Sequence, residues 1–294
     1  METRLALGTV ELGLDYGFRG SAHYRAPTRA DAIRVVHAAL ERGITLIDTA
    51  PAYGDAEGII GEALAGRGAS LRIATKVTVT ESCGDIRKSV EASLRALRME
   101  RVWLLQVHNA TLQVLERPGV VKALVAIREA GLVERVGAST YGEPAALAAL
   151  SNAEIGVLQV PYNILDQQLA RRVFPAAGAR GVAVLARSAF LRGVLTPRIA
   201  EAPGELAPLR DVAYRAYAAA GVGEADYAAF ALRYCLSNAN VDAVIVGVRS
   251  EMEVDAAVDA ARQGPLSDGL VRRLDEFSMS DHPLITPQSW TNLI

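Results

Sequence analysis

Short apolar segments rich in β-branched residues alternate along this chain with longer segments rich in alanine and leucine, and this alternation constrains the fold most. We expect eight of the short segments to be β-strands, at residues 5–8, 45–48, 72–76, 102–107, 134–137, 157–160, 182–185 and 243–246. Helices are expected between them, for example at 29–42, 85–97, 120–129 and 144–150. Strands that are apolar along their whole length are typical of parallel sheets, whose two faces are both buried.

Signals for helix ends agree with these boundaries. Thr28 is a plausible N-cap with Asp31 three residues later, and Gly43, Gly131 and Gly181 each separate a helix from the next strand. Eight β-then-α units in about 250 residues predict an α/β fold, a single (β/α)8 TIM barrel over residues 1–294 with its site at the carboxyl ends of the strands. A doubly wound sheet is the alternative, but no G-x-G-x-x-G motif follows the first predicted strand.

Two segments are too long for ordinary barrel loops. One spans about 187–222 and contains three prolines, and the other is the tail at about 278–294, which contains Trp290. Long irregular segments at a barrel mouth commonly cover the site or select the substrate. For the tail, a frayed terminus is an equally open interpretation.

Charge and cysteine content exclude several classes of protein. A net charge of −2 and a pI near 6.1 give no reason to expect binding to nucleic acid or to a membrane surface. No apolar run approaches the roughly 20 residues of a membrane helix, and the first residues lack a signal-peptide pattern. Cys83 and Cys235 are too few for a disulfide framework or a metal site. We therefore expect a cytoplasmic protein without a metal.

Four polar residues lie at or just beyond the ends of consecutive predicted strands: Asp48, Tyr53, Lys76 and His108. The carboxyl ends of barrel strands all open on one face, so these four side chains are expected to meet. Taken singly, each has an ordinary explanation as a helix cap, a half-buried aromatic, a surface ion pair or a core histidine. Their conjunction favours an active site.

Together these groups could move a proton. The tyrosine pKa is about 10, and a nearby ammonium such as Lys76 favours the phenolate. A buried lysine keeps its own proton only if a carboxylate such as Asp48 holds it. His108 could donate a hydrogen bond that orients a substrate carbonyl beside Tyr53.

At these residues the chain resembles the aldo-keto reductase superfamily. The motifs that carry the resemblance are GITLIDTAPAYG at 43–54, ATKV at 74–77, LLQVHN at 104–109, VGAST at 136–140 and LQVPYN at 158–163. The resemblance implies a NAD(P)H-dependent carbonyl reductase in which Tyr53 donates the proton, Lys76 and Asp48 tune it, and His108 orients the carbonyl. Ser139 and Gln159 match positions that hold the nicotinamide carboxamide, and Asp48 matches one that also touches the nicotinamide ribose.

Three positions depart from the family pattern. Arg187 stands where an aromatic side chain usually stacks on the nicotinamide, and it could stack there or pair with a phosphate or the substrate. The segment from Gly247 through Arg249 resembles the adenosine-phosphate clamp, but Glu253 replaces its usual basic residue, and Ala257 replaces an amide. NADPH is the expected coenzyme on the family pattern, with NADH possible.

The loop after the first predicted strand carries Tyr16, His23 and Tyr24, which could line a substrate pocket together with Trp290 of the tail. A solvated loop with incidental aromatics is the other interpretation. The expected partner is a small carbonyl compound. The sequence leaves its identity, the reaction direction and the oligomeric state open.

Two other functions remain open at this point. The chain could be a coenzyme-binding regulatory protein on the same barrel, with little turnover. It could also be a lyase that forms a Schiff base on Lys76, although that chemistry leaves Asp48 and Tyr53 unexplained.

Overall fold

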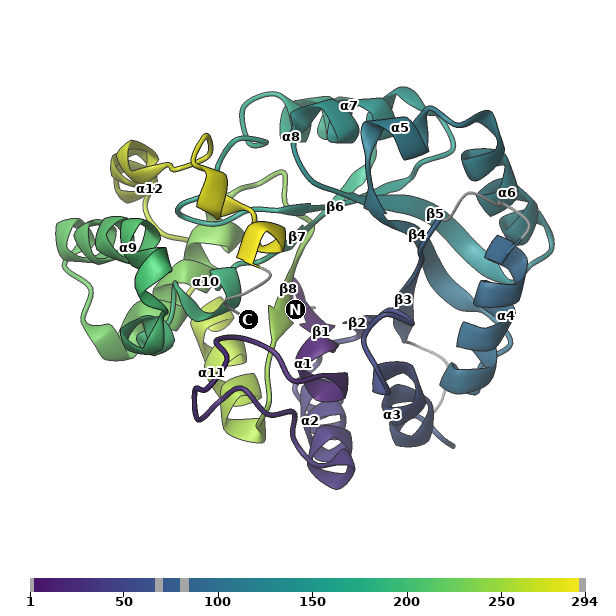
Figure 1. The fold of residues 1–294 in the computed structure, drawn as a ribbon, viewed down its shortest axis with the longest axis horizontal. Helices are drawn as coiled ribbons and strands as arrows, with labels where there is room; N and C mark the ends of the chain where they lie inside the picture. Colours follow the sequence, from purple (N-terminus) through teal and green to yellow (C-terminus); the bar gives the residue numbers. More distant parts are fainter. Residues whose placement is uncertain (1–2, 67–70, 80–84, 291–294) are drawn as a thin grey trace.

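The computed structural model describes residues 3–66, 71–79 and 85–290, so Cys83 and the last four residues lie outside it. Within these residues the strands form one closed parallel barrel in sequence order, and β1 pairs with both β2 and β8. Figure 1 looks down the barrel and shows the helices arranged around the ring of strands. The (β/α)8 prediction is confirmed.

Each predicted strand is present, with ends that differ by three residues or fewer. The strands are β1 Leu5–Gly8, β2 Leu46–Asp48, β3 Arg72–Val77, β4 Val102–Ala110, β5 Val133–Thr140, β6 Val157–Pro161, β7 Ala183–Arg187 and β8 Ala243–Gly247.

The helices lie between the strands and at the end of the described chain. They are α1 Val10–Gly13, α2 Arg29–Glu41, α3 Ala56–Ala63, α4 Asp85–Leu97, α5 Leu112–Leu115, α6 Pro118–Glu129, α7 Glu143–Ser151, α8 Val173–Ala179, α9 Ala207–Ala220, α10 Tyr227–Ser237, α11 Glu251–Arg262 and α12 Asp268–Leu274. Thr28 caps α2 as expected, because its hydroxyl accepts a hydrogen bond from the Asp31 amide. None of the helices in the described ranges has the length and apolar character needed to cross a membrane.

The segment 187–222 is more regular than the sequence indicated. It contains three 3-10 turns, Leu191–Gly193, Pro197–Glu201 and Gly204–Leu206, and then the whole of α9. Its prolines do not prevent this, because Pro197 and Pro208 stand in the first turns of their helices, where the missing amide hydrogen is not needed. The expectation of a wholly irregular segment was therefore wrong for its second half.

Side chains along each strand point alternately into and out of the barrel, and this alternation determines where the polar groups lie. Successive inward-facing positions are two residues apart. An apolar cluster that involves most of the strands fills the barrel interior and comprises Ala6, Leu46, Ala74, Leu104, Val157, Leu185, Ala243 and Ile245. Two residues closer to the carboxyl ends, the inward positions become polar on five strands, as Asp48, Lys76, Gln106, Gln159 and Arg187. The interior is thus apolar below and polar at the mouth.

Close packing of α1 against the turn before α3 fixes the segment that carries Tyr53. A Cβ on Gly13, the last residue of α1, would lie 2.0 Å from the Tyr53 carbonyl oxygen and 2.6 Å from the Ala56 amide nitrogen. Both neighbours are backbone atoms, so they cannot rotate away. The turn can approach α1 only because residue 13 has no side chain.

We therefore expect Gly13→Ala to lower the free energy of unfolding by roughly 1–3 kcal/mol, as overpacking commonly does. Urea denaturation measures this. Gly269→Ala is the matched control, because it lies in α12 with no atom within 4 Å of the added carbon and should be neutral or slightly stabilising. Equal effects of the two substitutions would contradict the packing argument.

Candidate active site

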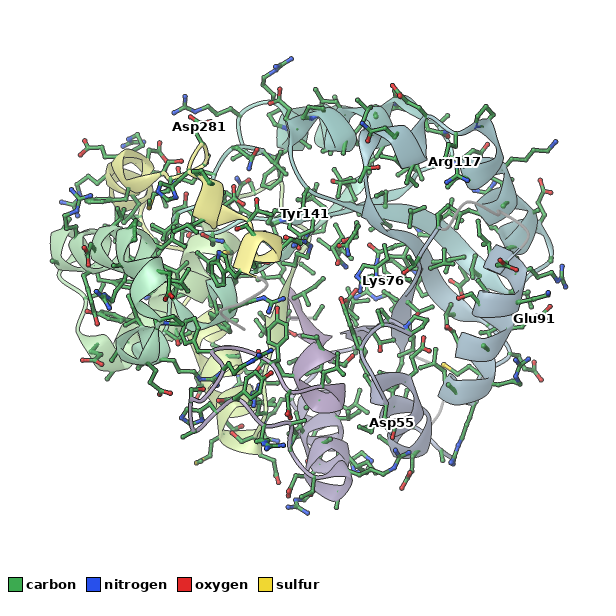
Figure 2. The ribbon with its side chains drawn as sticks, in the orientation of Figure 1. Asp55, Lys76, Glu91, Arg117, Tyr141 and Asp281 are labelled. Atoms are coloured by element: carbon green, nitrogen blue, oxygen red, sulfur yellow. The ribbon has the colours of Figure 1, made fainter. Side chains whose placement is uncertain are left out.

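The polar mouth of the barrel opens into a cavity of about 820 Å³. Residues from the carboxyl ends of several strands line it, including Asp48, His108, Ser139, Gln159 and Arg187. Figure 2 shows Lys76 inside the ring of strands, whereas Glu91 and Arg117 extend outside it. The structure therefore brings the predicted strand-end residues to one place.

A buried ion pair forms the base of the site. The Nζ atom of Lys76 donates to both carboxylate oxygens of Asp48, at 2.8 and 2.7 Å, and to the Thr49 carbonyl at 2.9 Å. Both side chains are buried. All three hydrogens of the ammonium group therefore have acceptors.

Lys76 is held in its charged form. Burial would lower the pKa of Lys76, but Asp48 and Tyr53 raise it by more, so the pKa lies above its ordinary value. A Schiff base needs a neutral amine with a free lone pair. This arrangement argues against the lyase hypothesis and supports a role for Lys76 as a fixed positive charge.

Tyr53 lies between the ion pair and His108. Its ring centroid is 4.8 Å from the Lys76 nitrogen, and its ring meets the His108 ring edge-on at 5.7 Å. Burial raises the pKa of Tyr53, and Lys76 lowers it by less. The expectation that the lysine would govern this pKa was therefore incomplete, because the effect of burial outweighs that of Lys76. Tyr53 remains a protonated phenol near neutral pH, as a proton donor must.

His108 is neutral in this setting. Burial lowers its pKa, Lys76 and Arg187 lower it further, Asp48 raises it in part, and the result is about 4. A neutral imidazole carries one N–H donor and one acceptor nitrogen. His108 can therefore donate a hydrogen bond without bringing another positive charge to the site.

A chain of hydrogen bonds joins Asp48 to the neighbouring strand ends. Gln159 donates through Nε2 to Asp48 at 2.7 Å, and the Ser139 hydroxyl donates to Oε1 of Gln159 at 3.2 Å. Gln106 makes a longer contact of 3.5 Å with the same carboxylate oxygen. The Gln159 amide keeps a second hydrogen and the Ser139 hydroxyl keeps lone pairs. Both residues line the cavity, so they can offer a donor and an acceptor to an amide group.

Arg187 was expected to stack on the nicotinamide ring or to pair with an anion. In the structure it lies over the ring of Tyr141. Its guanidinium carbon is 3.8 Å from the centroid of Tyr141, and its Nη2 donates to the Thr140 carbonyl at 3.1 Å. The side chain therefore stands at the cavity wall in a fixed orientation.

Arg249, a predicted coenzyme-binding residue, does not line the cavity, although Gly247, Val248 and Glu253 beside it do. Its Nε donates to Glu11 at 2.6 Å, and its terminal nitrogens donate to the backbone carbonyls of Tyr16 and Arg25 at 2.6 and 2.7 Å. Figure 1 shows the loop between α1 and α2 beside α11, where this contact forms. Glu253 accepts from the Arg249 amide at 2.6 Å and from Arg198 at 2.7 Å. Arg249 thus anchors the N-terminal loop, a role that its place in the sequence did not indicate.

The remaining predicted positions divide into two groups. Tyr16, His23, Tyr24 and Gly247 line the cavity. Trp290 does not, because it is buried and donates its indole N–H to the Leu284 carbonyl at 2.8 Å. Its neighbours Pro287 and Gln288 reach the cavity in its place.

Sequence reasoning missed several lining or supporting residues: Glu11, Gln106, Tyr141, Arg192 and Arg198. Gln106 could have been found, since it stands two residues before His108 on the same strand and so faces the same side. The others lie on loops or in α1, where no periodic signal indicates which way a side chain points.

The sequence profile of the Aldo/keto reductase family matches residues 4–279. This chain belongs to that family. It is therefore an oxidoreductase of carbonyl compounds that works with a nicotinamide coenzyme.

Individual relatives agree with this assignment. An aldo-keto reductase of Bacillus subtilis is 28% identical over 68% of this chain, an alignment that spans 62% of the relative's own length. L-galactose dehydrogenase of Arabidopsis thaliana is 25% identical over 79% of this chain and 78% of its own. The holo form of an aldo-keto reductase from Bacillus halodurans superposes with a TM-score of 0.79 at 26% identity, over 94% of this chain and 92% of that one.

The neutral state of His108 makes the stability of this aldo-keto reductase depend on pH. Its pKa falls from 6.5 to about 4 on folding, so the unfolded chain binds the extra proton first as the pH drops. The contribution of His108 to stability is fully present above pH 6.5 and is lost as the pH falls toward 4. We expect His108→Gln to reduce the loss in unfolding free energy between pH 7.5 and pH 5, measured by urea denaturation.

The control for that experiment is His23→Gln, which changes an exposed histidine of the N-terminal loop. It should keep the pH dependence of the unmodified protein. If His108→Gln kept the same dependence as well, the assignment of a neutral buried imidazole would be wrong.

Proposed function

We propose that this enzyme reduces an aldehyde or ketone to an alcohol, with Tyr53 as the proton donor. The observation that carries the proposal is the buried Lys76–Asp48 pair beside Tyr53, at the base of a cavity large enough for a coenzyme and a small substrate. The substrate we infer is a small molecule and not a nucleic acid, and the setting we infer is the cytoplasm, on the charge and cysteine content of the chain.

The strand-end residues fit a nicotinamide coenzyme. Ser139 and Gln159 offer one acceptor and one donor to the cavity, which is what a carboxamide requires. Ser139 and Gln159 are buried, and Asp48 holds Gln159, so the orientation of both side chains is fixed before a ligand arrives. When bound there, the coenzyme supplies hydride to the carbonyl carbon.

The side chains of the protein supply the proton. His108 donates a hydrogen bond to the carbonyl oxygen and holds it near the Tyr53 hydroxyl. The phenol then gives its proton to that oxygen as negative charge develops on it. Lys76 stabilises the phenolate that remains, and Asp48 keeps Lys76 charged throughout. The burial of the ion pair strengthens this effect, because water does not screen it.

Replacing the proton donor tests this assignment. Tyr53→Phe should lower kcat by about 100-fold or more, which is the usual contribution of general acid catalysis. The coenzyme dissociation constant should not change, because Ser139 and Gln159, the residues proposed to hold the nicotinamide, are left as they are. Turnover is followed by the loss of reduced nicotinamide absorbance, and binding by fluorescence titration.

Tyr214→Phe serves as the control, since Tyr214 is exposed on α9. Retained turnover in Tyr53→Phe would defeat the role of Tyr53. Tight coenzyme binding by the unmodified protein without turnover of any carbonyl would favour the regulatory function instead.

The choice of coenzyme depends on the charges near Arg249. Family resemblance favours NADPH, whose 2′-phosphate needs free basic side chains. Here Arg249 is paired with Glu11 and Arg198 with Glu253, so the four charges cancel. The 2′-phosphate of NADPH would have to displace Glu11 or Glu253 from its arginine. The adenosine ribose of NADH has a free 2′-hydroxyl, which can donate a hydrogen bond to Glu253. These pairs favour NADH, the alternative coenzyme.

We expect Glu253→Gln to raise the affinity for NADPH relative to NADH by about tenfold, which corresponds to about 1.4 kcal/mol. The reason is that Arg198 keeps only its longer 3.8 Å contact with Glu11 and that one repulsive charge is removed. Glu251→Gln is the control, because Glu251 lies on the same helix but is exposed and makes only a 3.6 Å contact with Arg34. Parallel fluorescence titrations with the two coenzymes give the ratio. No change in that ratio would show that Glu253 does not face the ribose.

A further inference from the structure

The cavity lining contains acidic and basic side chains, and the acidic ones are all paired. The acidic residues of the lining are Glu11, Asp15, Asp48 and Glu253. Each of them has a basic partner, in Arg249, Arg25, Lys76 and Arg198 respectively. No lining carboxylate is therefore left free for another basic group.

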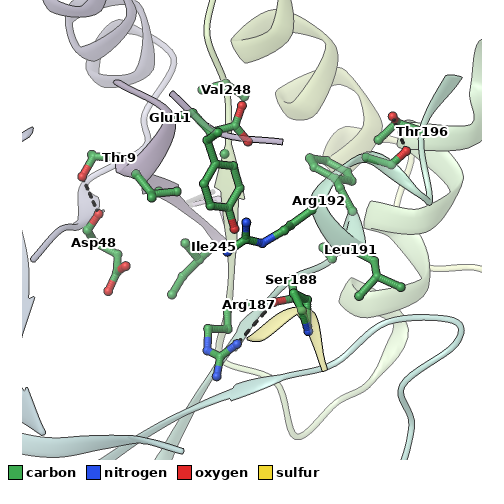
Figure 3. A pocket seen from close by; sticks show the side chains of 18 of the residues that line it. Thr9, Glu11, Asp48, Arg187, Ser188, Leu191, Arg192, Thr196, Ile245 and Val248 are labelled. Atoms are coloured by element: carbon green, nitrogen blue, oxygen red, sulfur yellow. Dashed lines mark hydrogen bonds between the residues drawn. The ribbon is translucent and has the colours of Figure 1, made fainter. Parts of the chain in front are cut away.

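Two lining arginines, Arg187 and Arg192, have no acidic partner within 4.0 Å among the residues that the structure describes. Arg198, the third arginine of the lining, is paired with Glu253. Asp166 is near enough to Arg187 to feel its charge, but its carboxylate accepts from Gln168. Figure 3 shows Arg187 and Arg192 beside the cavity; Arg187 is the last residue of β7, and Arg192 lies in the 3-10 turn Leu191–Gly193 that follows it.

Both side chains are held in place by aromatic rings and not by a carboxylate. Arg187 stacks on Tyr141 at 3.8 Å, and Arg192 stacks on Tyr16 at 4.2 Å from guanidinium carbon to ring centroid. Stacking occupies the face of a guanidinium group and leaves much of its edge free to donate hydrogen bonds. The two groups are thus oriented but still have hydrogens to offer.

The backbone that presents them is strained. Ser188, Leu191 and Arg192 have φ values of 62°, 43° and 54°, in the left-handed region that residues with side chains seldom occupy. Such conformations persist where the surroundings enforce them, and they concentrate at functional sites. A strained turn that carries an unpaired cation into a cavity is hard to explain by stability alone.

Arg187 stands close to the reacting groups. Its charge acts on both Tyr53 and His108, and it faces the same cavity as they do. A substrate whose carbonyl lies between Tyr53 and His108 therefore places its remaining groups within reach of this arginine. The planar fork of a guanidinium group matches carboxylate and phosphate oxygens in pairs.

We propose that Arg187, supported by Arg192, binds an anionic group of the substrate, so that the preferred substrate is an aldehyde or ketone that carries a carboxylate or a phosphate. This inference rests on the carbonyl reduction proposed above. The other anion that enters the cavity is the pyrophosphate of the coenzyme, and the test below separates the two.

The test uses pairs of carbonyl compounds that differ in one anionic group: 4-carboxybenzaldehyde against benzaldehyde, and glyceraldehyde 3-phosphate against glyceraldehyde. The quantity compared is the ratio of kcat/KM for the anionic member to that for the neutral member. We expect a ratio of about 10 to 100 for at least one pair, the size that a charge-assisted hydrogen bond gives. In Arg187→Gln the ratio should fall toward one, and in Arg187→Lys it should be intermediate.

Arg198→Gln is the matched control, since Arg198 lines the same cavity but already has a carboxylate partner. It should leave the ratio as in the unmodified protein. Coenzyme dissociation constants are measured for every variant. A ratio near one in the unmodified protein would overturn the inference, as would an equal loss for both members of a pair. A loss confined to coenzyme affinity would also overturn it, because the arginines would then hold the pyrophosphate.

A binding measurement keeps the anionic site distinct from the reductase proposal. The coenzyme-loaded protein is titrated with 4-(hydroxymethyl)benzoate and with benzyl alcohol, the reduced forms of the first pair. Tighter binding of the anion, lost in Arg187→Gln, supports the anionic site even if no aldehyde is turned over, in which case only the reductase proposal falls. Turnover of neutral aldehydes without any preference for the anion sinks the anionic site and leaves the reductase proposal standing.

Discussion

The site depends on one buried pair of opposite charges. Neither Lys76 nor Asp48 could stay charged alone at this depth, because removing an ion from water costs several kcal/mol. They are stable together because the lysine has three acceptors and the carboxylate has donors on both oxygens. The pair in turn requires the parallel register of β2 and β3, in which Asp48 lies beside Ala74 and Lys76 follows two residues further along β3. The electrostatics of the site therefore depend directly on the pairing of the barrel strands.

Asp48 also connects the two halves of the mouth. Its Oδ1 accepts from Lys76 and from Gln159, so one carboxylate orients the proton-donating side and the amide on β6. Ser139 continues this chain to β5. Replacing Asp48 would leave a buried lysine unpaired and would release Gln159 at the same time. Effects of substitutions at these positions should consequently be far from additive, as is usual for shared hydrogen-bond networks.

Much of this arrangement could be predicted from the sequence, because it depends on the two-residue period of side chains along a strand and on the order of the strands in the barrel. Asp48, Lys76 and Gln159 each follow an inward-facing apolar residue by two positions, and a barrel brings strand ends together. The partners of Arg249 could not be predicted, because Glu11 lies at the other end of the chain and only folding brings the two together. The pKa of Tyr53 was similarly inaccessible, since it reflects a balance between burial and charge that needs coordinates. Helix α9 was missed because the prolines were taken as signs of irregular structure, although Pro208 stands in the first turn of the helix.

The anchoring of the N-terminal loop has a consequence for how the protein is made. Arg249 and Glu11 are 238 residues apart, so the loop that borders the cavity is anchored by a side chain that is synthesised long after the loop itself. The seam between β1 and β8 closes at the same stage, because β8 is the last strand of the ring. During translation the first strand and its loop must wait with their hydrogen-bonding groups exposed. A nascent chain stopped before residue 243 would thus hold the catalytic groups but would lack β8 and could not close its barrel.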